Sequence, residues 1–297
     1  MSLTFSIITP SYNQGRYIEQ TIQSVLNQNY PNLEYVIIDG GSTDNTVEII
    51  KKYEKHVKFW ISEEDKGQAN AINKGLNYCT GEIFNWLNSD DYLEPCSLMK
   101  IAAAFEDKKV QMVAGKVRNF SLTEEIIIQN QKLSAEGIML WKPGVQFVQP
   151  GVWLRRNLIE RAGGIDENYH YSFDWDLYIR YLYHFPFVKE IPDLLVHFRL
   201  HNNSKTQSSI EKFLTEELQI IKKLSLLNEF TELHNACNLK IQKAEWTAFL
   251  SKQSRSTNSF TVKLLAVLRK MNSYQQHISY SRQTAGAIKA FWKQKEI

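Results

Sequence analysis

The stretch Trp86-Leu87-Asn88-Ser89-Asp90-Asp91 decides the fold that the sequence predicts. The apolar run that leads into it ends abruptly in two adjacent carboxylates. In α/β sheets, ligands bind beyond the carboxyl ends of the strands. Hard oxygen donors in such a place suit Mg²⁺ or Mn²⁺ that carries phosphate. Taken alone, the stretch is equally typical of a strand followed by a solvated turn.

Short apolar runs and helical patterns alternate over the first part of the chain. Apolar runs predict strands at residues 5–8, 35–38, 58–61 and 82–87. Apolar spacing predicts helices around 18–26, around 46–50 and over 68–78. This alternation predicts an α/β fold, a Rossmann-like mixed, mainly parallel sheet flanked by helices.

The middle of the chain is less regular. Strands are expected at 110–113, 117–120 and 126–128, with antiparallel pairing, and at 188–191 and 194–199. We expect a turn at Gln149–Trp153 before a short helix at 155–162, and a second helix over 174–184. From Ser208 onward the pattern is helical, with a polar break at Ser251–Asn258.

Composition and charge divide the 297-residue chain in two. After Lys205 there are 14 basic and 7 acidic residues, a net charge of +7, whereas the rest carries −4. We therefore expect an α/β domain over 1–205 and a helical C-terminal region over 206–297. The three cysteines are widely spaced, which suits a reducing cytoplasm. No apolar run is long enough to cross a bilayer, and the N-terminus does not resemble a signal peptide, so we expect a cytoplasmic protein.

Each of the first four predicted strands ends in polar side chains. Right-handed crossovers bring these ends to one edge of the sheet. That edge combines an aromatic ring for stacking, an acid for a base or ribose, a lysine for phosphate and an acid pair for a metal, which predicts a nucleoside-diphosphate site. The residues are Thr9, Tyr12 and Asn13; Asp39; Glu63–Gln68; and Asn88, Asp90 and Asp91. No glycine-rich phosphate loop is present, so a metal would have to offset the diphosphate charge.

Each of these residues also has a purely structural explanation. Tyr12 could cover the edge of the sheet, Asp39 could belong to an Asp-Gly turn, and Lys66 could be a solvated charge. It is improbable that all four predicted strands end in polar residues for structural reasons alone, so the set as a whole favours a binding site.

Four motifs, in this order, resemble those of family 2 glycosyltransferases. They are Ile7–Asn13, Asp39–Asp44, Asp65–Gly67 with Ala71–Gly75, and Asn88–Asp91. The resemblance covers roughly residues 3–205 and implies the glycosyltransferase A fold. About 1–91 would bind the nucleotide sugar, and about 92–205 would form the acceptor and catalytic part.

The resemblance implies roles for individual residues. The nucleotide-sugar site would comprise Thr9, Pro10, Tyr12, Asn13, Asp39, Asp65, Lys66, Gln68, Asn88, Asp90 and Arg199, with uridine as the usual nucleoside. Asn88 replaces the first acid of the metal motif. This leaves Asp91 for a divalent metal, Mn²⁺ or Mg²⁺, and Asp90 for ribose or metal.

Two downstream segments complete the implied site. In Ser172–Arg180, Asp174 matches the family's catalytic base and Phe173 stands where a Glu is common. Asp174 could instead cap a helix, and Asp176 is the alternative base. In Arg199–Ser204, His201 would contact the metal or pyrophosphate, or else be an exposed loop histidine. Acceptor contacts are expected from Gln149–Trp153.

The implied reaction is a single displacement that inverts the sugar anomer. The base removes the proton of an acceptor hydroxyl while the metal and basic groups stabilise the departing diphosphate. Two alternatives stay open: a catalytically silent sugar-nucleotide-binding protein, which the intact acids disfavour, and a nucleotidyltransferase, which the missing phosphate loop disfavours. The expected partners are a nucleotide-sugar donor and a glycan or lipid-linked acceptor. Nucleic acid is not expected, because no reader motif is present.

The C-terminal region carries apolar stripes beside basic residues. They are Phe260, Leu264, Val267, Leu268 and Met271, and then Ile288, Phe291 and Trp292. Such stripes suit helices that lie on an anionic membrane surface, which would put the protein at the inner face of the membrane. They suit equally a helix packed on the catalytic domain or in a homodimer.

Overall fold

The computed structural model describes residues 3–201 and 210–255. The chain forms two compact units, residues 1–220 and residues 221–297. The dividing point lies inside helix α9 (Ile210–Leu226). A domain boundary near residue 205 stays a prediction.

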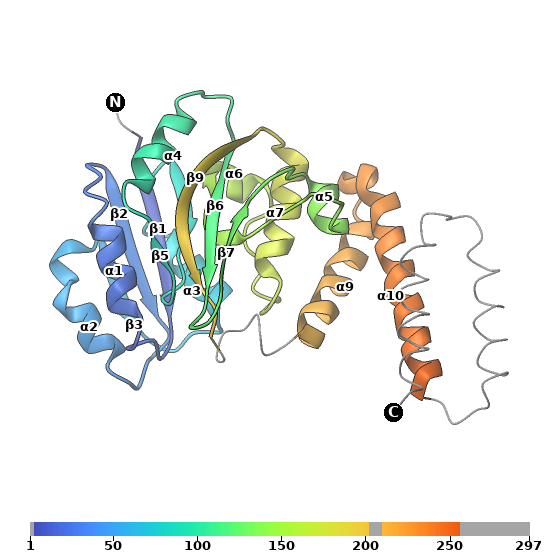
Figure 1. Cartoon of the computed structure of the whole chain (residues 1–297), viewed down its shortest axis with the longest axis horizontal. Helices are drawn as coiled ribbons and strands as arrows, with labels where there is room; N and C mark the ends of the chain where they lie inside the picture. The colour runs from blue at the N-terminus through green and yellow to red at the C-terminus, as the bar shows by residue number, and fades with distance from the viewer. Residues whose placement is uncertain (1–2, 202–209, 256–297) are drawn as a thin grey trace. The chain divides into compact units, whose positions relative to one another are not determined.

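In the described part of the chain, nine strands of the first unit form one sheet in the order β3-β2-β1-β4-β8-β6-β9-β5, with β7 paired to β6. The four N-terminal strands are all parallel, as the alternating pattern predicts. Their bounds are Phe5–Ser11 (β1), Leu33–Asp39 (β2), Phe59–Ser62 (β3) and Ile83–Trp86 (β4). The helices between them are α1 (Ile18–Leu26), α2 (Thr46–Lys52) and α3 (Gln68–Leu76), and a short 3₁₀ helix, η1, spans Glu54–His56. Helices α1 and α2 pack against each other, and α3 packs on β1 and β2 (Figure 1).

The second half of the sheet is mixed. Its strands are β5 (Tyr92–Leu93), β6 (Met112–Phe120), β7 (Glu125–Gln129), β8 (Val152–Arg155) and β9 (Val188–Arg199). The helices are α4 (Ser97–Phe105), α5 (Ala135–Leu140), α6 (Asn157–Arg161) and α7 (Phe173–His184), with a 3₁₀ helix, η2, at Gln149–Gly151. Strands β7 and β8 run antiparallel to β6, and β9 runs parallel to it. This mixed sheet flanked by helices confirms the predicted fold class.

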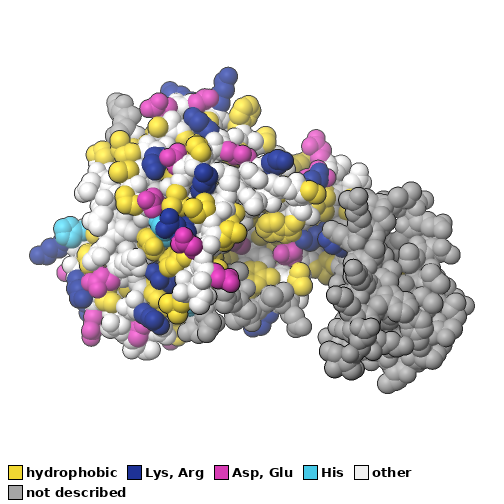
Figure 2. Space-filling model, viewed as in Figure 1, with side chains coloured by type: hydrophobic (Ala, Val, Ile, Leu, Met, Phe, Trp, Pro, Cys, Tyr) yellow, Lys and Arg dark blue, Asp and Glu magenta, His cyan; other side chains and the backbone are white. Residues whose placement is uncertain are grey.

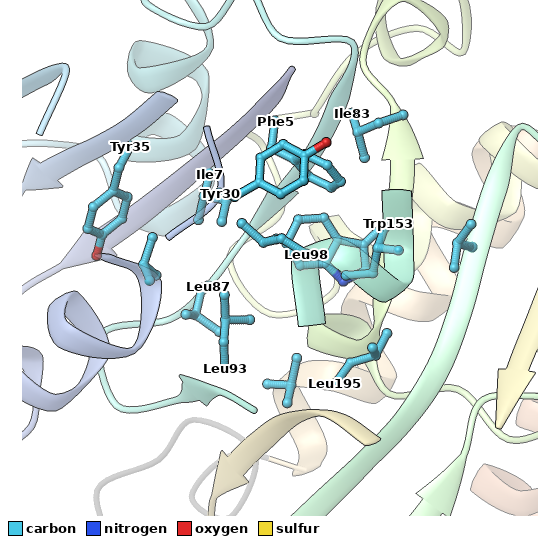
Figure 3. Packing of buried hydrophobic residues seen from close by; sticks show 14 of the residues in the cluster. Phe5, Ile7, Tyr30, Tyr35, Ile83, Leu87, Leu93, Leu98, Trp153 and Leu195 are labelled. Carbon is cyan, nitrogen blue, oxygen red and sulfur yellow. The ribbon is translucent and has the colours of Figure 1, made fainter. Parts of the chain in front are cut away.

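One large apolar cluster joins the two halves of the sheet (Figure 3). The rings of Phe5 and Trp153 lie 5.6 Å apart edge to face, and Tyr30 packs edge-on against Phe5 at 4.9 Å. A buried aromatic side chain removes roughly 150–250 Å² from water, so these rings dominate the packing energy of the cluster. Trp153 is 1% exposed and its side chain belongs to the core, so the predicted contact with an acceptor is limited to its main chain.

Strand β8 lies where the sequence predicts only a turn before a helix. Leu154 and Arg155 pair with β4, and residues 152–154 pair with β6, so β8 connects the two halves of the sheet. Residues 149–151 do form a tight turn, but the helix that follows begins only at Asn157. Such a short strand has little periodicity of its own, and only its two neighbours specify it.

Two predicted strand breaks are bulges inside long strands. Strand β6 runs through Gly115, where its register with β9 shifts. A Cβ at Gly115 would lie 2.3 Å from Cδ1 of Leu195, so only glycine lets the two strands approach here. Strand β9 likewise continues through Pro192, which the same irregularity accommodates.

The described part of the second unit is helical. After the end of α9 come the 3₁₀ helix η3 (Asn228–Leu233) and α10 (His234–Arg255). Helix α10 passes through Ser251–Arg255, so the polar break predicted there is wrong for these residues. The apolar stripes from Phe260 onward lie outside the described residues.

The described helices include none with the length and apolar character needed to span a bilayer. On the visible face of the described residues, basic and acidic side chains are interspersed (Figure 2). Cys79 is a buried free thiol and Cys96 an exposed one.

Glu34 ties together the amino ends of the parallel strands. Its carboxylate accepts hydrogen bonds from Ser6 Oγ at 2.6 Å and from the backbone nitrogens of Thr80 and Gly81 at 2.7 and 2.9 Å. Lys58 Nζ lies 2.5 Å away. Burial alone would raise the pKa of Glu34, but hydrogen bonds from Lys58, Ser6 and Thr80 lower that pKa to about 2. The charged form of Glu34 therefore stabilises this end of the sheet.

We predict that Glu34→Gln lowers the free energy of unfolding by about 1–2 kcal/mol at neutral pH. The folded-state pKa of Glu34 lies below its unfolded value, so its contribution is full above about pH 4.5 and is lost as the pH falls toward about 2. Urea unfolding of wild type and variant should show the difference narrowing over that range. The same change at exposed Glu54 should have no such effect, and a pH-independent difference for Glu34→Gln would contradict the account.

Candidate functional site

Asp39 is the centre of a buried hydrogen-bond cluster at the end of β2. Its carboxylate accepts bonds from the backbone nitrogen and hydroxyl of Ser42 at 2.9 and 2.5 Å. The hydroxyl of Ser62, at the end of β3, donates to it at 2.6 Å. Asp39 has no exposed surface, so a nucleobase could use only its remaining acceptor capacity.

The loop after β1 is locked to the loop after β2. The backbone nitrogen of Asn13 donates to Ser42 Oγ at 2.7 Å, and the Asn13 side chain accepts from the Thr43 backbone nitrogen at 2.8 Å. Asn13 has a φ of 53°, a left-handed conformation that asparagine tolerates. Beside it, Tyr12 is 61% exposed and available for stacking.

The Thr9 side chain does not face the predicted nucleotide-sugar site. Its side chain is fully buried, and its hydroxyl is hydrogen-bonded to the Tyr35 hydroxyl at 3.0 Å inside the sheet. Pro10, the next residue of β1, is also buried. Any contact of these two residues with a nucleoside is therefore limited to their main chain.

The loop after β3 packs against the end of β2. A Cβ at Gly40 would lie 2.7 Å from Oδ2 of Asp65, so the absent side chain is what lets this carboxylate approach. Asp65 Oδ1 accepts the backbone nitrogen of Gly67 at 2.7 Å, and Gly67 has a φ of 107°. Lys66, between them, is exposed.

A chain of hydrogen bonds runs from α3 into the turn after β4. Gln68 Nε2 donates to Asn88 Oδ1 at 2.7 Å, and Asn88 Nδ2 donates to Asp91 Oδ2 at 3.2 Å. The backbone oxygen of Asp91 accepts the Thr21 hydroxyl of α1 at 2.6 Å. Asn88, which replaces an acid of the family motif, therefore links the start of α3 to the acid pair.

The end of β9 meets the same turn from the other half of the sheet. The Arg199 backbone nitrogen donates to Asp91 Oδ1 at 2.9 Å, and Arg199 Nε donates to the Asp90 backbone oxygen at 3.0 Å. His201 Nε2 lies 2.9 Å from Asp90 Oδ2. The Tyr17 ring lies beneath both basic residues, 4.9 Å from the Arg199 guanidinium and 5.1 Å from the His201 ring. Asp90, Asp91, Arg199 and His201 thus converge, as the family resemblance implies.

Asp91 is 1% exposed, and its environment disfavours its charge. Burial raises the pKa of Asp91 well above its usual range, and the charge of Asp90 raises it further. The hydrogen bonds from Arg199 and Asn88 act in the opposite direction. Two adjacent carboxylates in this setting would be stabilised by a nearby cation.

The possible metal ligands of the site fit a divalent cation that is bound partly by the protein and partly by substrate phosphate. In the described ranges, no group of three or more His, Cys, Asp or Glu side chains could hold a metal ion. Asp90 and Asp91 nevertheless offer oxygen ligands, and Mg²⁺ is commonly held by one or two carboxylates together with substrate phosphates. His201, within hydrogen-bond distance of Asp90, is the further ligand that the sequence predicts.

The two candidate bases on α7 have different surroundings. Asp174 is partly exposed in the first turn, where Ser172, not Asp174, is the N-cap residue. Asp176 is fully buried, and its Oδ2 accepts two bonds from Arg180, from Nη2 at 2.6 Å and from Nε at 3.1 Å. Arg180 also donates to the Gly164 backbone oxygen at 2.8 Å. This buried ion pair disfavours Asp176 as the base and leaves Asp174.

The model of glycosyl transferase family 2 matches residues 6–163, more than half of the chain. The chain belongs to glycosyl transferase family 2. It is therefore a glycosyltransferase. The matched residues contain the loops after β1 to β4 but end before α7 and β9, so the roles of Asp174, Arg199 and His201 rest on the geometry above and remain predictions.

Three other proteins are informative comparisons for this family 2 glycosyltransferase. Chondroitin synthase of Escherichia coli is 41% identical over 92 residues, which cover 30% of this chain and 13% of that protein. Staphylococcus aureus TarS 1–349, solved with UDP-GlcNAc, superimposes with a TM-score of 0.64 at 18% identity over 79% of this chain and 72% of that one. The mannosyltransferase PcManGT of Pyrobaculum calidifontis, solved with GDP-Man and Mn²⁺, gives 0.61 at 18% over 97% and 86%. The two structural likenesses confirm the expected glycosyltransferase A fold.

Several positions of this glycosyltransferase site are not recognisable from sequence. Gln20 Oε1 accepts from Arg199 Nη2 at 2.7 Å, and Tyr17 and Thr21 come from the same region of α1. Ser62 is visible only as the end of a strand. Gln149, expected among the acceptor contacts, is buried, and its amide donates to Asn85 Oδ1 at 2.9 Å, so its side chain supports β4. The residues of the α1 region and Ser62 carry no local pattern that could have revealed their contacts.

We predict that Asp176→Asn and Arg180→Ala each lower the free energy of unfolding by about 3–5 kcal/mol, because each leaves a buried partner unpaired. Lys142→Ala, which breaks the exposed pair with Glu136, should cost less than about 1 kcal/mol. Denaturant unfolding measures all three. If Asp176→Asn were as stable as Lys142→Ala, Asp176 would lose its structural role and return as a candidate base.

Proposed function

We propose that this protein is an inverting, metal-dependent glycosyltransferase that moves a sugar from a UDP-sugar to an acceptor hydroxyl in cell-surface polysaccharide synthesis. The observation that carries the proposal is the hydrogen-bond chain from Gln68 through Asn88 and Asp91 to Arg199. It joins the start of α3, directly after the loop expected to cover the nucleotide, to the acid pair and to a basic group. The partial match to a chondroitin synthase supports a polysaccharide product.

The proposed donor site lies at the carboxyl ends of the parallel strands. The exposed Tyr12 ring can stack on a base, and Lys66 can reach a phosphate. Asp39 can accept the N3 proton of uracil with the acceptor capacity that Ser42 and Ser62 leave. TarS with UDP-GlcNAc and PcManGT with GDP-Man have the same fold, so uridine rests on the family resemblance and on Asp39.

Asp90, Asp91 and His201 are the residues that would hold the metal. When bound, a divalent cation would neutralise charge on the departing diphosphate. Arg199 contributes a fixed positive charge beside the same turn, because its guanidinium is held by Gln20 and by the Asp90 backbone oxygen. Fixed charges of this kind stabilise a leaving group without reorganisation during the reaction.

Asp174 is the proposed base. It would take the proton of the acceptor hydroxyl while the oxygen attacks the anomeric carbon from the face opposite to the diphosphate, which inverts the anomer. The bond to the diphosphate breaks as the new glycosidic bond forms, so no covalent enzyme intermediate is required. The acceptor, whether a glycan or a lipid-linked sugar, stays a prediction of class only.

Product analysis tests the function. The protein is incubated with a panel of UDP- and GDP-sugars, Mn²⁺ or Mg²⁺ and candidate glycan acceptors, and nucleoside diphosphate release is measured. We expect UDP from a UDP-sugar. Pyrophosphate as the product would instead indicate a nucleotidyltransferase, and tight nucleotide binding without any product would indicate a silent binding protein.

We predict that chelator abolishes diphosphate release and that Asp91→Asn lowers it by at least about 100-fold. Asp91 lies in the turn between β4 and β5, and the amide of Asp91→Asn keeps the shape of the side chain and can still accept the Arg199 N–H, so the circular dichroism spectrum should stay unchanged. Titration calorimetry should show that Mn²⁺ strengthens UDP binding to the wild type but not to Asp91→Asn. Full activity of the variant, or activity in excess chelator, would exclude the metal role.

We predict that Asp174→Asn lowers the transfer rate by about 10²- to 10⁴-fold, the usual effect of removing a general base. The amide keeps the shape of the side chain but cannot accept the proton. UDP affinity should stay within about twofold of the wild type, because Asp174 is assigned to the acceptor. A variant that transfers sugar at the wild-type rate would show that another group is the base.

A further inference from the structure

One carboxylate of α9 holds three consecutive backbone nitrogens just before α7. Glu216 Oε1 accepts from His170 N at 2.9 Å. Glu216 Oε2 accepts from Tyr171 N at 2.7 Å and from Ser172 N at 2.9 Å. Hydrogen bonds to a charged acceptor are roughly twice as strong as neutral ones, so this contact fixes the segment firmly.

The side chain of the N-cap residue of α7 is hydrogen-bonded to α9 instead of to its own helix. Ser172 is the N-cap residue, but its hydroxyl makes no capping bond and lies 3.4 Å from the Phe213 backbone oxygen. The Tyr171 ring packs edge-on against Phe213 at 5.3 Å, and Lys212 Nζ donates to the Tyr171 hydroxyl at 3.0 Å. The direction in which α7 begins is therefore set by α9.

The opposite side of this segment faces the donor loop. A Cβ at Gly67 would lie 3.1 Å from Nδ1 of His170, so this histidine packs directly on the loop after β3. Glu167, a few residues earlier, accepts from the side chains of Asn70 and Asn73 on α3, each at 2.8 Å. The segment 167–172 therefore bridges α9 and the nucleotide-proximal helix α3.

We propose that Glu216 is a positioning residue for Asp174, an assignment that rests on the proposed function of Asp174 as the base. Asp174 lies two residues after the last backbone nitrogen that Glu216 holds, in the first turn of α7. A shift of residues 170–172 would move the start of α7 and with it this carboxylate. A misplacement of about 1 Å at a reacting group can cost roughly 100-fold in rate.

The chemistry of three adjacent donors calls for a carboxylate at position 216. A glutamine there has only one acceptor oxygen, and its amide protons would face backbone N–H groups. An aspartate is one methylene shorter and cannot reach all three. The bond from His170 is exposed and those from Tyr171 and Ser172 are only partly buried, so water can replace them in part and Glu216→Gln is expected to fold.

Hydrogen exchange tests the contact without any need for activity. In the wild-type protein, the amides of His170, Tyr171 and Ser172 should be protected. Glu216→Gln should raise their exchange rates by about 10-fold or more, while the core strand β1 stays protected. The same change at exposed Glu106, at the end of α4, is the matched control and should leave all these rates unchanged.

Kinetics test the positioning. With the best donor found for the wild type, Glu216→Gln should lower kcat by about 10- to 100-fold and leave the donor KM within about twofold. In a double-mutant cycle, Glu216→Gln should add little to the loss already caused by Asp174→Asn, because both act through the same group. Glu216→Asp should recover part of the lost rate if it retains some of the bonds.

The outcomes separate this proposal from the proposed function. Wild-type activity of Glu216→Gln, or fully additive losses in the cycle, would overturn the positioning role while the glycosyltransferase assignment stood. Unchanged exchange at residues 170–172 would overturn the contact itself. A wild-type protein that releases no nucleoside diphosphate from any donor would instead contradict the proposed function.

Discussion

The hydrogen bond from the Arg199 backbone nitrogen to the Asp91 carboxylate is the constraint on which the rest of the site depends. Asp91 is buried, and a buried carboxylate without partners would cost several kcal/mol. The turn after β4 therefore needs the end of β9, although 108 residues separate the two in sequence. The same contact carries Arg199 and His201 to Asp90. A substitution that frees β9 would disperse the candidate metal ligands and the fixed positive charge together.

The site has two parts that different layers of the fold position. The parallel strands hold the donor part, in which Asp39 and Asn13 lock neighbouring loops together through Ser42. Helix α7 carries Asp174, and its first turn is oriented by α9. The packing of His170 against Gly67 is where the two parts meet. The proposed donor and acceptor parts are thereby linked by hydrogen-bonded segments rather than by one continuous element.

The parallel half of the fold was predictable because the local sequence pattern of each strand and helix is sufficient to identify it. Each of the strands β1 to β4 is an apolar run that ends in a motif, and the alternation with helices determines how they pair. The second half was less predictable because pairing outweighs local pattern there. Strand β8 is specified by its two neighbours, and Gly115 is a bulge within β6 that resembles a break. The convergence of Arg199 and His201 on the acid pair was expected only through the family resemblance.

The burial of individual residues set the limit of site prediction. Sequence alone could not tell that the Thr9 hydroxyl faces Tyr35, or that Asp176 is held by Arg180 while Asp174, on the same helix, is accessible. Asp174 and Asp176 are both candidate bases in the sequence. They differ in burial, because Asp176 lies on the buried face of α7 whereas Asp174 is partly exposed. Glu216 belongs to a helix after the expected domain boundary, so no motif could have connected it to the site.

A crystal structure of the protein with UDP and Mn²⁺ would show whether the Asp90–Asp91 turn binds the metal, because manganese can be located by its anomalous signal. We expect one manganese peak bound by the side chains of the Asp90–Asp91 turn and by diphosphate oxygens, with the bond from Arg199 to Asp91 intact. A manganese peak elsewhere, or a diphosphate bound away from the Asn88–Asp91 turn, would contradict it.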